Sequence, residues 1–325
     1  MITDIHRHFV PPDFFDFLKA QPEFSVRVKR EDGEGIDADI RGMHFGLNKT
    51  FFDLSRQIAR MKSEGVERAI LSLATPFIDY HLDAAIAVKA ARRFNESLAS
   101  AIKDHSRQFG AWAFLPMQDP AAAADELRRC VREFNFVGGH VGSNVRGAYL
   151  NDEQFDAVYR AALDLNVPLF VHPADPPGKE RTRDYELTVV AGYLFDSTIN
   201  ILKMICSGFL DRWPALKLVC AHGGAFSTIL RARMQREVDT NARSAENLTR
   251  SVGEYLARLY FDTVCFEPKI LEYVTTVVPA EHLFMGSDAP FPLGEPDPVN
   301  FVRRALPAQQ AEAVLSQNFS RLIGC

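Results

Sequence analysis

Five side chains that lie far apart in the sequence are of the types that bind and use a metal ion. They are His6, His8, His172, His222 and Asp288. In an extended strand, side chains two residues apart point to the same side, so the imidazoles of His6 and His8 can both reach one ion. Neutral imidazoles with a carboxylate suit zinc or a similar divalent cation, and a water on such a cation can have its pKa lowered from ~16 to ~7. The five residues therefore predict a mononuclear, catalytic metal site.

Short apolar runs rich in β-branched and aromatic residues alternate along the chain with longer stretches of helical periodicity. This alternation is typical of βαβ units and a parallel sheet. We expect eight strands, at residues 2–6, 66–73, 109–115, 136–142, 167–172, 217–222, 259–264 and 282–287. The helical stretches include residues 50–63, 83–104, 120–134, 152–165, 198–210, 225–241 and 252–258. Eight strands that alternate with helices predict an α/β fold, the (β/α)8 TIM barrel.

The turn after the first expected strand disfavours the other common α/β fold, an open doubly wound sheet. That fold has a Gly-rich turn at this place, whereas this chain continues from His8 with Phe9-Val10-Pro11-Pro12. Residues 11–49 form a longer insertion of mixed charge with Gly and Pro, which in a barrel would lie over the C-terminal mouth as a lid. Since no linker or repeat is visible, we expect one domain over residues 1–325.

The expected strand ends explain how the five side chains could meet. In a parallel barrel the C-terminal ends of all strands open onto one face. His6 ends the first expected strand, His172 the fifth and His222 the sixth, while Asp288 follows the eighth. A single histidine at a strand end is usually a hydrogen-bonded structural residue. Four separate strand ends that each deliver a ligand-type side chain are much harder to obtain by chance, so the metal interpretation is preferred.

The other histidines are weaker candidates. Four of them do not fall at C-terminal strand ends, and we interpret them as surface or local structural groups: His44, His81, His105 and His282. His140 lies within the fourth expected strand. Its side chain could point into the barrel, toward the floor of the metal site, or outward to the helices, and the sequence leaves both open.

Composition and charge indicate a globular protein that acts on small molecules. The 325 residues include 47% hydrophobic ones, enough for a sizeable core. Basic residues number 37 and acidic ones 42, for a formal net charge of −5. The basic surface expected of a nucleic-acid-binding protein is therefore absent, and we expect no nucleic-acid partner.

The cysteines and the N-terminus suggest a cytoplasmic protein. The five cysteines are widely spaced and form no C-x-x-C pair, so we expect buried thiols in a reducing compartment. The first residues lack the basic and apolar regions of a signal peptide, and no apolar run is long enough for a membrane span. We expect no contact with a membrane.

Several motifs resemble the amidohydrolase superfamily (amidohydrolase-2 type), in its decarboxylase branch typified by α-amino-β-carboxymuconate-ε-semialdehyde decarboxylase. The motifs span most of the chain and are Asp4-Ile5-His6-Arg7-His8 with Pro11, Phe170-Val171-His172-Pro173, Asp211-Arg212-Trp213-Pro214 leading to Ala221-His222-Gly223-Gly224, and Met285-Gly286-Ser287-Asp288-Ala289-Pro290-Phe291-Pro292-Leu293-Gly294-Glu295.

The resemblance implies a role for each site residue. His6, His8, His172 and Asp288 would bind one divalent metal ion, usually zinc, with manganese or iron possible. His222 would act as acid/base beside a metal-bound water, and Asp288 would also belong to the catalytic group. No organic cofactor is implied. The carboxylated lysine of dinuclear relatives is absent here, which is consistent with one metal.

Substrate contacts and assembly are also implied. Arg233 matches a family arginine that reaches across a dimer interface to hold a substrate carboxylate, although it could equally be a solvated helix charge. Lys49 in the lid and Phe291 in the last motif are further candidates for substrate binding. The resemblance implies a homodimer. The family's Trp-Asp is Phe52-Asp53 here and its Thr-Asp-Tyr is Ser287-Asp288-Ala289, so the substrate is left open.

Three functions fit these residues. We prefer a non-oxidative decarboxylase, a carbon–carbon lyase, acting on a small unsaturated or aromatic carboxylate. The same metal site would also serve a hydrolase or hydratase acting on a lactone, an amide or a carbon–carbon double bond. A metal-stabilised binding protein without turnover is disfavoured, because a structural zinc site would be closed by four Cys or His ligands.

Overall fold

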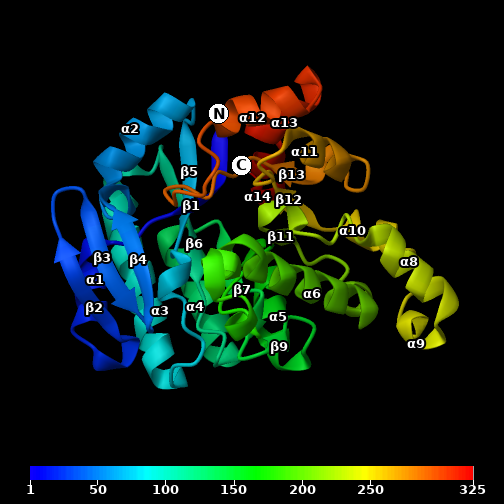
Figure 1. Ribbon diagram of the computed structural model, residues 1–325, viewed down its shortest axis with the longest axis horizontal. Coiled ribbons are helices and arrows are strands. Elements are labelled where there is room, and N and C mark those ends of the chain that lie inside the picture. The colour runs from blue at the N-terminus through cyan, green and yellow to red at the C-terminus, as the bar shows by residue number, and fades with distance from the viewer. Residues whose placement is uncertain (325) are drawn as a thin grey trace.

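Eight parallel strands form a barrel at the centre of the computed structural model, which describes residues 1–324 (Figure 1). In spatial order the strands are β1 (Thr3–His8), β5 (Arg68–Ser72), β6 (Phe109–Phe114), β7 (Gly138–Gly142), β10 (Leu169–His172), β11 (Leu218–Cys220), β12 (Tyr260–Asp262) and β13 (Leu283–Phe284). Each falls largely within an expected strand, and spatial order follows chain order. The predicted (β/α)8 barrel is confirmed.

Backbone hydrogen bonds join the first strand to the segment after the last one. The Ile5 amide donates to the Met285 carbonyl at 2.9 Å, and the His8 amide donates to the Ala289 carbonyl at 2.7 Å. Between them, the Asp288 amide donates to the His6 carbonyl at 2.9 Å. This seam closes the barrel and sets Asp288 beside the two N-terminal histidines.

Helices surround the barrel (Figure 1). Their bounds are α2 (Leu54–Glu64), α3 (Ala84–Ile102), α4 (Pro120–Phe134), α5 (Asp156–Asp164), α6 (Tyr193–Cys206), α7 (Phe209–Arg212), α8 (Arg231–Thr240), α9 (Ala242–Ala245), α10 (Val252–Leu256), α11 (Pro268–Thr275), α12 (Pro298–Ala305), α13 (Ala308–Ser316) and α14 (Asn318–Ile323). Two predictions need correction. The helix expected at 225–241 begins only at Arg231, because His222 and Ala225 have positive φ and the chain turns there. The helix expected at 198–210 breaks at Gly208, whose φ is 72°.

The segment at residues 11–49 has more structure than its sequence suggested. It contains helix α1 (Pro12–Lys19) and a three-stranded antiparallel sheet of β2 (Val26–Glu31), β3 (Gly35–Ile40) and β4 (Met43–Asn48). Alternate residues of β3 are buried, so one face of this sheet packs on the rest of the protein. At the end of this segment, the side-chain amide of Asn48 donates to the backbone carbonyl of Pro290 at 3.0 Å, which holds the segment against the loop that carries Asp288.

An aromatic layer fills the barrel beneath the site. The ring of Trp112 lies 5.4 Å from that of Phe170 and 5.7 Å from that of Phe319 on α14. Phe284 contacts Phe319 at 5.6 Å. Phe170 in turn lies with its ring 5.0 Å from that of His6, so the site stands on a layer of buried aromatic rings.

The thiols agree with the expectation in part. The four described cysteines are free, and Cys130 and Cys220 are buried as expected, but Cys206 and Cys265 are partly exposed. Cys325 lies outside the described residues.

Over residues 1–324, one helical run, Asp184–Cys206, is long and apolar enough to cross a membrane by length and composition alone. A buried helix of a globular core passes the same test, and a single such run is weak support for a membrane span.

A buried ion-pair network holds the first strand in register. Arg7 is fully buried, and its Nε donates to Asp4 at 2.9 Å while another guanidinium nitrogen pairs with Glu64 of α2. Asp4 also accepts the Ser287 hydroxyl at 2.6 Å. Arg7 therefore points away from the metal side. It ties β1 to α2 through Glu64 and, through Asp4, to Ser287, the residue before Asp288.

We expect Arg7→Met to lower the free energy of unfolding by about 3–5 kcal/mol, because Asp4 would remain as a buried charge without a cationic partner and Glu64 would keep only Arg60. Guanidinium chloride unfolding measures the change. The control is Arg128→Met, which removes a surface pair with Asp125 and should cost about 1 kcal/mol or less. Equal losses in the two variants would contradict the network's role.

Candidate metal centre

The five predicted site residues converge on one point at the C-terminal end of the barrel. One ligand atom from each of His6, His172, His222 and Asp288 lies within 4.8 Å of the others. His8 completes the group, with its Nε2 3.2 Å from Nε2 of His6 and 3.0 Å from Oδ1 of Asp288. Imidazoles that lie far apart in the sequence therefore meet where the sheet closes into a barrel.

Hydrogen bonds at Nδ1 leave three Nε2 lone pairs facing the centre. The His6 Nδ1 lies 2.6 Å from Asp262, the His8 Nδ1 lies 3.3 Å from the Leu73 carbonyl, and the His172 Nδ1 lies 2.9 Å from the Pro173 carbonyl. Each acceptor places the ring proton on Nδ1, so that Nε2 is free to bind. The buried Nε2 of His172 has no partner within the described residues. Three converging lone pairs beside a carboxylate fit a divalent cation.

His222 differs from the other three imidazoles. Its Nε2 lies 3.5 Å from Oδ2 of Asp288, and its Nδ1 has no hydrogen-bond partner within residues 1–324. The side chains of His222 and Asp288 are each 12% exposed, whereas those of His6 and His8 are fully buried. His222 therefore lies on the open side of the centre, where a substrate would enter.

His222 and Asp288 are held in uncommon backbone conformations. Their φ angles are 58° and 60°, in the left-handed region that residues other than glycine rarely adopt. Neighbouring hydrogen bonds hold both turns: the amide of Gly223 donates to Asp262 at 2.9 Å, and the amide of Asp288 donates to the His6 carbonyl at 2.9 Å. Strain of this kind is typical of functional positions.

Asp262, at the end of β12, is a functional candidate that the sequence reasoning missed. One carboxylate oxygen lies 2.6 Å from Nδ1 of His6, and the other accepts the amide of Gly223 next to His222. The carboxylate thus orients two of the histidines at once. The seventh expected strand runs to residue 264, so Asp262 fell inside it and the rule that selected His172 and His222, a polar residue at a strand end, did not mark it.

A glycine permits the close approach of the last strand to this group. A Cβ at Gly286 would lie 2.9 Å from Cβ of His6 and 3.0 Å from Cβ of Asp262, closer than such atoms approach in proteins. Any side chain at this position would push the seam apart and displace the His6–Asp262 pair.

His140 points into the barrel, which resolves the alternative that the sequence left open. It is fully buried, its ring lies 5.9 Å from that of His172, and neither ring nitrogen has a partner within the described residues. Burial lowers the pKa of His140 well below its ordinary value, so the ring is neutral.

The candidates for substrate binding are placed differently from one another. Phe291 lies in the centre, with its ring 5.1 Å from that of His8 and 4.9 Å from that of Phe51. Arg233 is exposed on α8, which projects from the barrel (Figure 1). Lys49 lines a separate cavity, and the lining of that cavity includes none of the five converging residues.

Charges in the metal-free centre are strongly coupled. Burial by itself lowers the pKa of His6, but Asp288 and the hydrogen bond to Asp262 outweigh it and raise that pKa to about 10. Burial raises the pKa of Asp288, yet His6 and His222 hold it well below its ordinary value. Burial lowers the pKa of His8 and, more strongly, that of His172. Near neutral pH in the metal-free centre, His6 therefore carries a proton on Nε2 as well as on Nδ1, and Asp288 is charged.

Comparison with known proteins identifies the family. The amidohydrolase family model matches residues 3–324. The chain belongs to this amidohydrolase family. It is 27% identical over 300 residues to 2-amino-3-carboxymuconate-6-semialdehyde decarboxylase of Dictyostelium discoideum, which covers 90% of this chain and 82% of that protein. It is 34% identical over 179 residues to gamma-resorcylate decarboxylase of a Polaromonas species, covering 52% of this chain and 55% of the relative.

A solved structure shares the fold. The 5-carboxyvanillate decarboxylase of Novosphingobium aromaticivorans, crystallised with bound manganese and 3-methoxy-4-hydroxy-5-nitrobenzoic acid, superposes with a TM-score of 0.84. It is 22% identical and covers 100% of this chain and 97% of that one. At this identity the likeness shows the fold alone.

We expect Asp262→Asn to weaken metal affinity by about 10- to 100-fold, because an amide facing Nδ1 of His6 no longer stabilises the tautomer that leaves Nε2 free. Competition with a chromogenic chelator measures the affinity. Asp297→Asn, at a surface pair with Arg304, is the control and should bind metal as the unmodified protein does. Unchanged affinity in Asp262→Asn would remove this residue from the centre.

Metal binding should release about one proton at pH 7, because an ion can bind Nε2 of His6 only after the proton that its raised pKa retains has left. His8 and His172 are already neutral there and add none. Affinity should therefore rise by about tenfold per pH unit from neutral pH toward pH 10. Calorimetry in two buffers with different ionisation enthalpies counts the protons, and binding without proton release would contradict the assignment.

Proposed function

We propose that the protein is a metal-dependent non-oxidative decarboxylase, a carboxy-lyase that acts on a small unsaturated or aromatic carboxylic acid. The observation that carries this proposal is that the centre contains both a set of converging metal ligands and a separate histidine on its open side. Three buried imidazoles and Asp288 offer converging ligand atoms, while His222 lies on the open side and its Nδ1 has no hydrogen-bond partner within residues 1–324. The two relatives named above are decarboxylases, which favours this reaction over hydrolysis or hydration.

We assign His6, His8, His172 and Asp288 as the metal ligands and zinc as the resident ion, with manganese as the alternative. The manganese in the Novosphingobium structure supports that alternative. The ion, when bound, supplies positive charge that orients substrate oxygens and stabilises negative charge on them. No organic cofactor is needed for the reaction below.

His222 is the acid in the proposed reaction. Its imidazolium gives a proton to the carbon that bears the carboxylate. The new carbon–hydrogen bond forms from a π electron pair of the substrate. The bond from that carbon to the carboxylate then breaks, its electron pair restores the double bond, and carbon dioxide leaves. One proton is consumed for each carboxylate lost, so atoms and charge balance. Asp288, 3.5 Å from Nε2 of His222, stabilises the protonated ring before the transfer.

The apolar part of the centre suits a flat substrate. Phe291 forms a wall beside His8, and Phe51 extends that wall by an edge-to-face contact. The aromatic floor at Phe170 lies beneath His6. Phe51 and Phe170 are fully buried and support the partly exposed ring of Phe291 and the histidines. A planar unsaturated acid can lie against Phe291 while its polar groups face the ligands, which is the physical basis for the substrate class.

We further propose a homodimer in which Arg233 serves the neighbouring subunit. Helix α8 projects from its own barrel, and Arg233 is exposed on it (Figure 1). Large apolar side chains are exposed on α6, namely Phe195 and Ile199, and just before α8, namely Ile229, and each is more than 40% exposed. Burial of such side chains favours association, and Arg233 would then meet a substrate carboxylate from across the interface. We expect the protein to work in the cytoplasm.

His222→Ala should keep its metal and lose decarboxylation by about 10²- to 10⁴-fold, because the variant lacks the proton donor but retains the ligands. The assay follows release of labelled carbon dioxide from a panel of phenolic and muconate-type acids, with metal content measured on the same samples.

His105→Ala is the matched control, since this histidine precedes β6, at the opposite end of the barrel from the centre. It should retain full turnover. Retained activity in His222→Ala would exclude His222 as the acid. Release of an alcohol, an amine or a hydrated product without carbon dioxide would replace the decarboxylase with a hydrolase or hydratase.

A further inference from the structure

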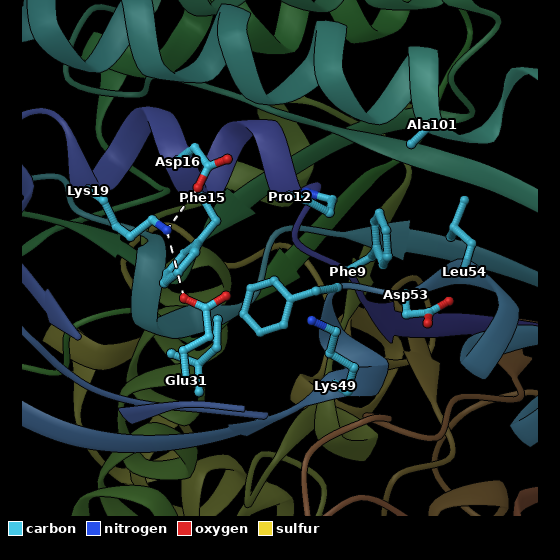
Figure 2. A pocket seen from close by; sticks show the side chains of 12 residues that line it. Phe9, Pro12, Phe15, Asp16, Lys19, Glu31, Lys49, Asp53, Leu54 and Ala101 are labelled. Carbon is cyan, nitrogen blue, oxygen red and sulfur yellow. Dashed lines mark ion pairs between the residues drawn. The ribbon is translucent and has the colours of Figure 1, made fainter. Parts of the chain in front are cut away.

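A second cavity lies between helix α1, the Lys49–Phe51 turn and the sheet β2–β4 (Figure 2). Its volume is about 420 Å³, within the range of small-molecule sites. Three aromatic side chains, Phe9, Phe15 and Phe52, line it together with aliphatic groups. Within residues 1–324, its lining includes none of the five converging residues of the metal centre.

Two lysines line this cavity, and among the described residues only Lys19 has a carboxylate partner. Nζ of Lys19 lies 2.8 Å from Asp16 and 3.9 Å from Glu31, and it stands 5.0 Å above the ring of Phe15. Lys19 therefore pairs with Asp16 and, at longer range, with Glu31, and the side chains of these two acids are 71% and 48% exposed, so solvent screens their charges. The ion pairs of the described residues include none for Lys49, and the dashed lines of Figure 2 run only from Lys19. The Lys49 amino group points toward the middle of the lining side chains.

The third acid in the lining, Asp53, forms hydrogen bonds with the first turn of α2. Oδ1 of Asp53 accepts the amides of Ser55 and Arg56, at 2.8 and 3.3 Å, as the N-cap of α2. The charge of Asp53 is therefore stabilised by the helix terminus. Among the described residues, the half-buried ammonium group of Lys49 therefore has no carboxylate partner, and aromatic side chains lie around it. An anion that carries an apolar group would stabilise such an ammonium group.

We propose that this cavity is a second ligand site, which binds a small monocarboxylate with an aromatic or alkyl body. The carboxylate pairs with Lys49, and the apolar part packs against Phe9, Phe15 and Phe52. The site is independent of the proposed reaction, because its residues are not among the metal ligands and do not include His222.

The cavity nevertheless adjoins the metal centre through the backbone. Phe9 follows His8 directly, and the amide of Val10 donates to the Phe51 carbonyl at 2.8 Å. The side-chain amide of Gln57 bridges the two segments, since it donates to the carbonyls of His8 at 2.9 Å and Thr50 at 3.0 Å. A carboxylate bound to Lys49 would thus contact the Lys49–Phe51 turn, and this turn is hydrogen-bonded to the end of β1, the strand that carries His6 and His8.

Bromine locates the ligand directly. Crystals of the metal-loaded protein are soaked in 4-bromobenzoate, and anomalous diffraction is collected at the bromine edge. Binding in solution is followed in parallel by ¹⁹F NMR with 4-fluorobenzoate. We expect an anomalous peak among Phe9, Phe15 and Phe52, separate from any peak at the metal centre, together with saturable binding in solution.

Lysine variants test the assigned contact. Lys49→Met should lose the cavity peak and weaken that binding by about tenfold or more, because a charge-assisted hydrogen bond is removed. Lys49→Arg should retain both, which guards against a folding defect. The matched control is Lys19→Met, whose ammonium is already paired and whose loss should leave the peak in place.

Three results would overturn the site: a bromine peak only at the metal centre, a cavity peak unchanged in Lys49→Met, or binding at crystal concentration only. None of these results bears on carbon dioxide release, so the cavity and the proposed reaction stand or fall separately.

Discussion

The metal centre depends on the seam where the last strand of the barrel closes onto the first. Two histidines come from β1 and the carboxylate comes from the loop after β13, nearly the full length of the chain away. Backbone hydrogen bonds at the seam, from Asp288 to His6 and from His8 to Ala289, fix their relative positions. Since side chains alternate along a strand, a shift of one residue would turn the imidazoles away from the carboxylate.

The seam is secured by charges that lie outside the centre. Asp4 binds Arg7 within β1 and the hydroxyl of Ser287 across the seam, while Asp262 holds His6 from β12. These buried carboxylates stabilise the fold only while their partners remain, because a buried charge without a partner is costly. The positive φ of His222 and Asp288 adds local strain. A bound cation would offset part of this cost by binding the imidazole nitrogens and the carboxylate that converge at the centre.

Much of the fold could be predicted from the sequence because strand and helix periodicity is local. The apolar runs marked all eight strands, and polar residues at their ends marked the five converging side chains. Asp262 was missed because it follows the aromatic pair Tyr260-Phe261 and looks like a strand residue, whereas its role depends on where His6 lies in space. The sheet of β2, β3 and β4 was missed because β2 is largely exposed and charged. The cavity at Lys49 depends on which lysine finds a partner, which periodicity cannot predict.

The central claim is that closure of the barrel assembles one metal site from these residues. Anomalous diffraction from crystals of the purified protein, recorded above and below the absorption edge of the metal found in it, tests this directly. The account predicts one peak per chain, bonded to nitrogen atoms of His6, His8 and His172 and an oxygen atom of Asp288. A protein that binds no divalent ion, or a peak that lies away from the seam, would contradict it.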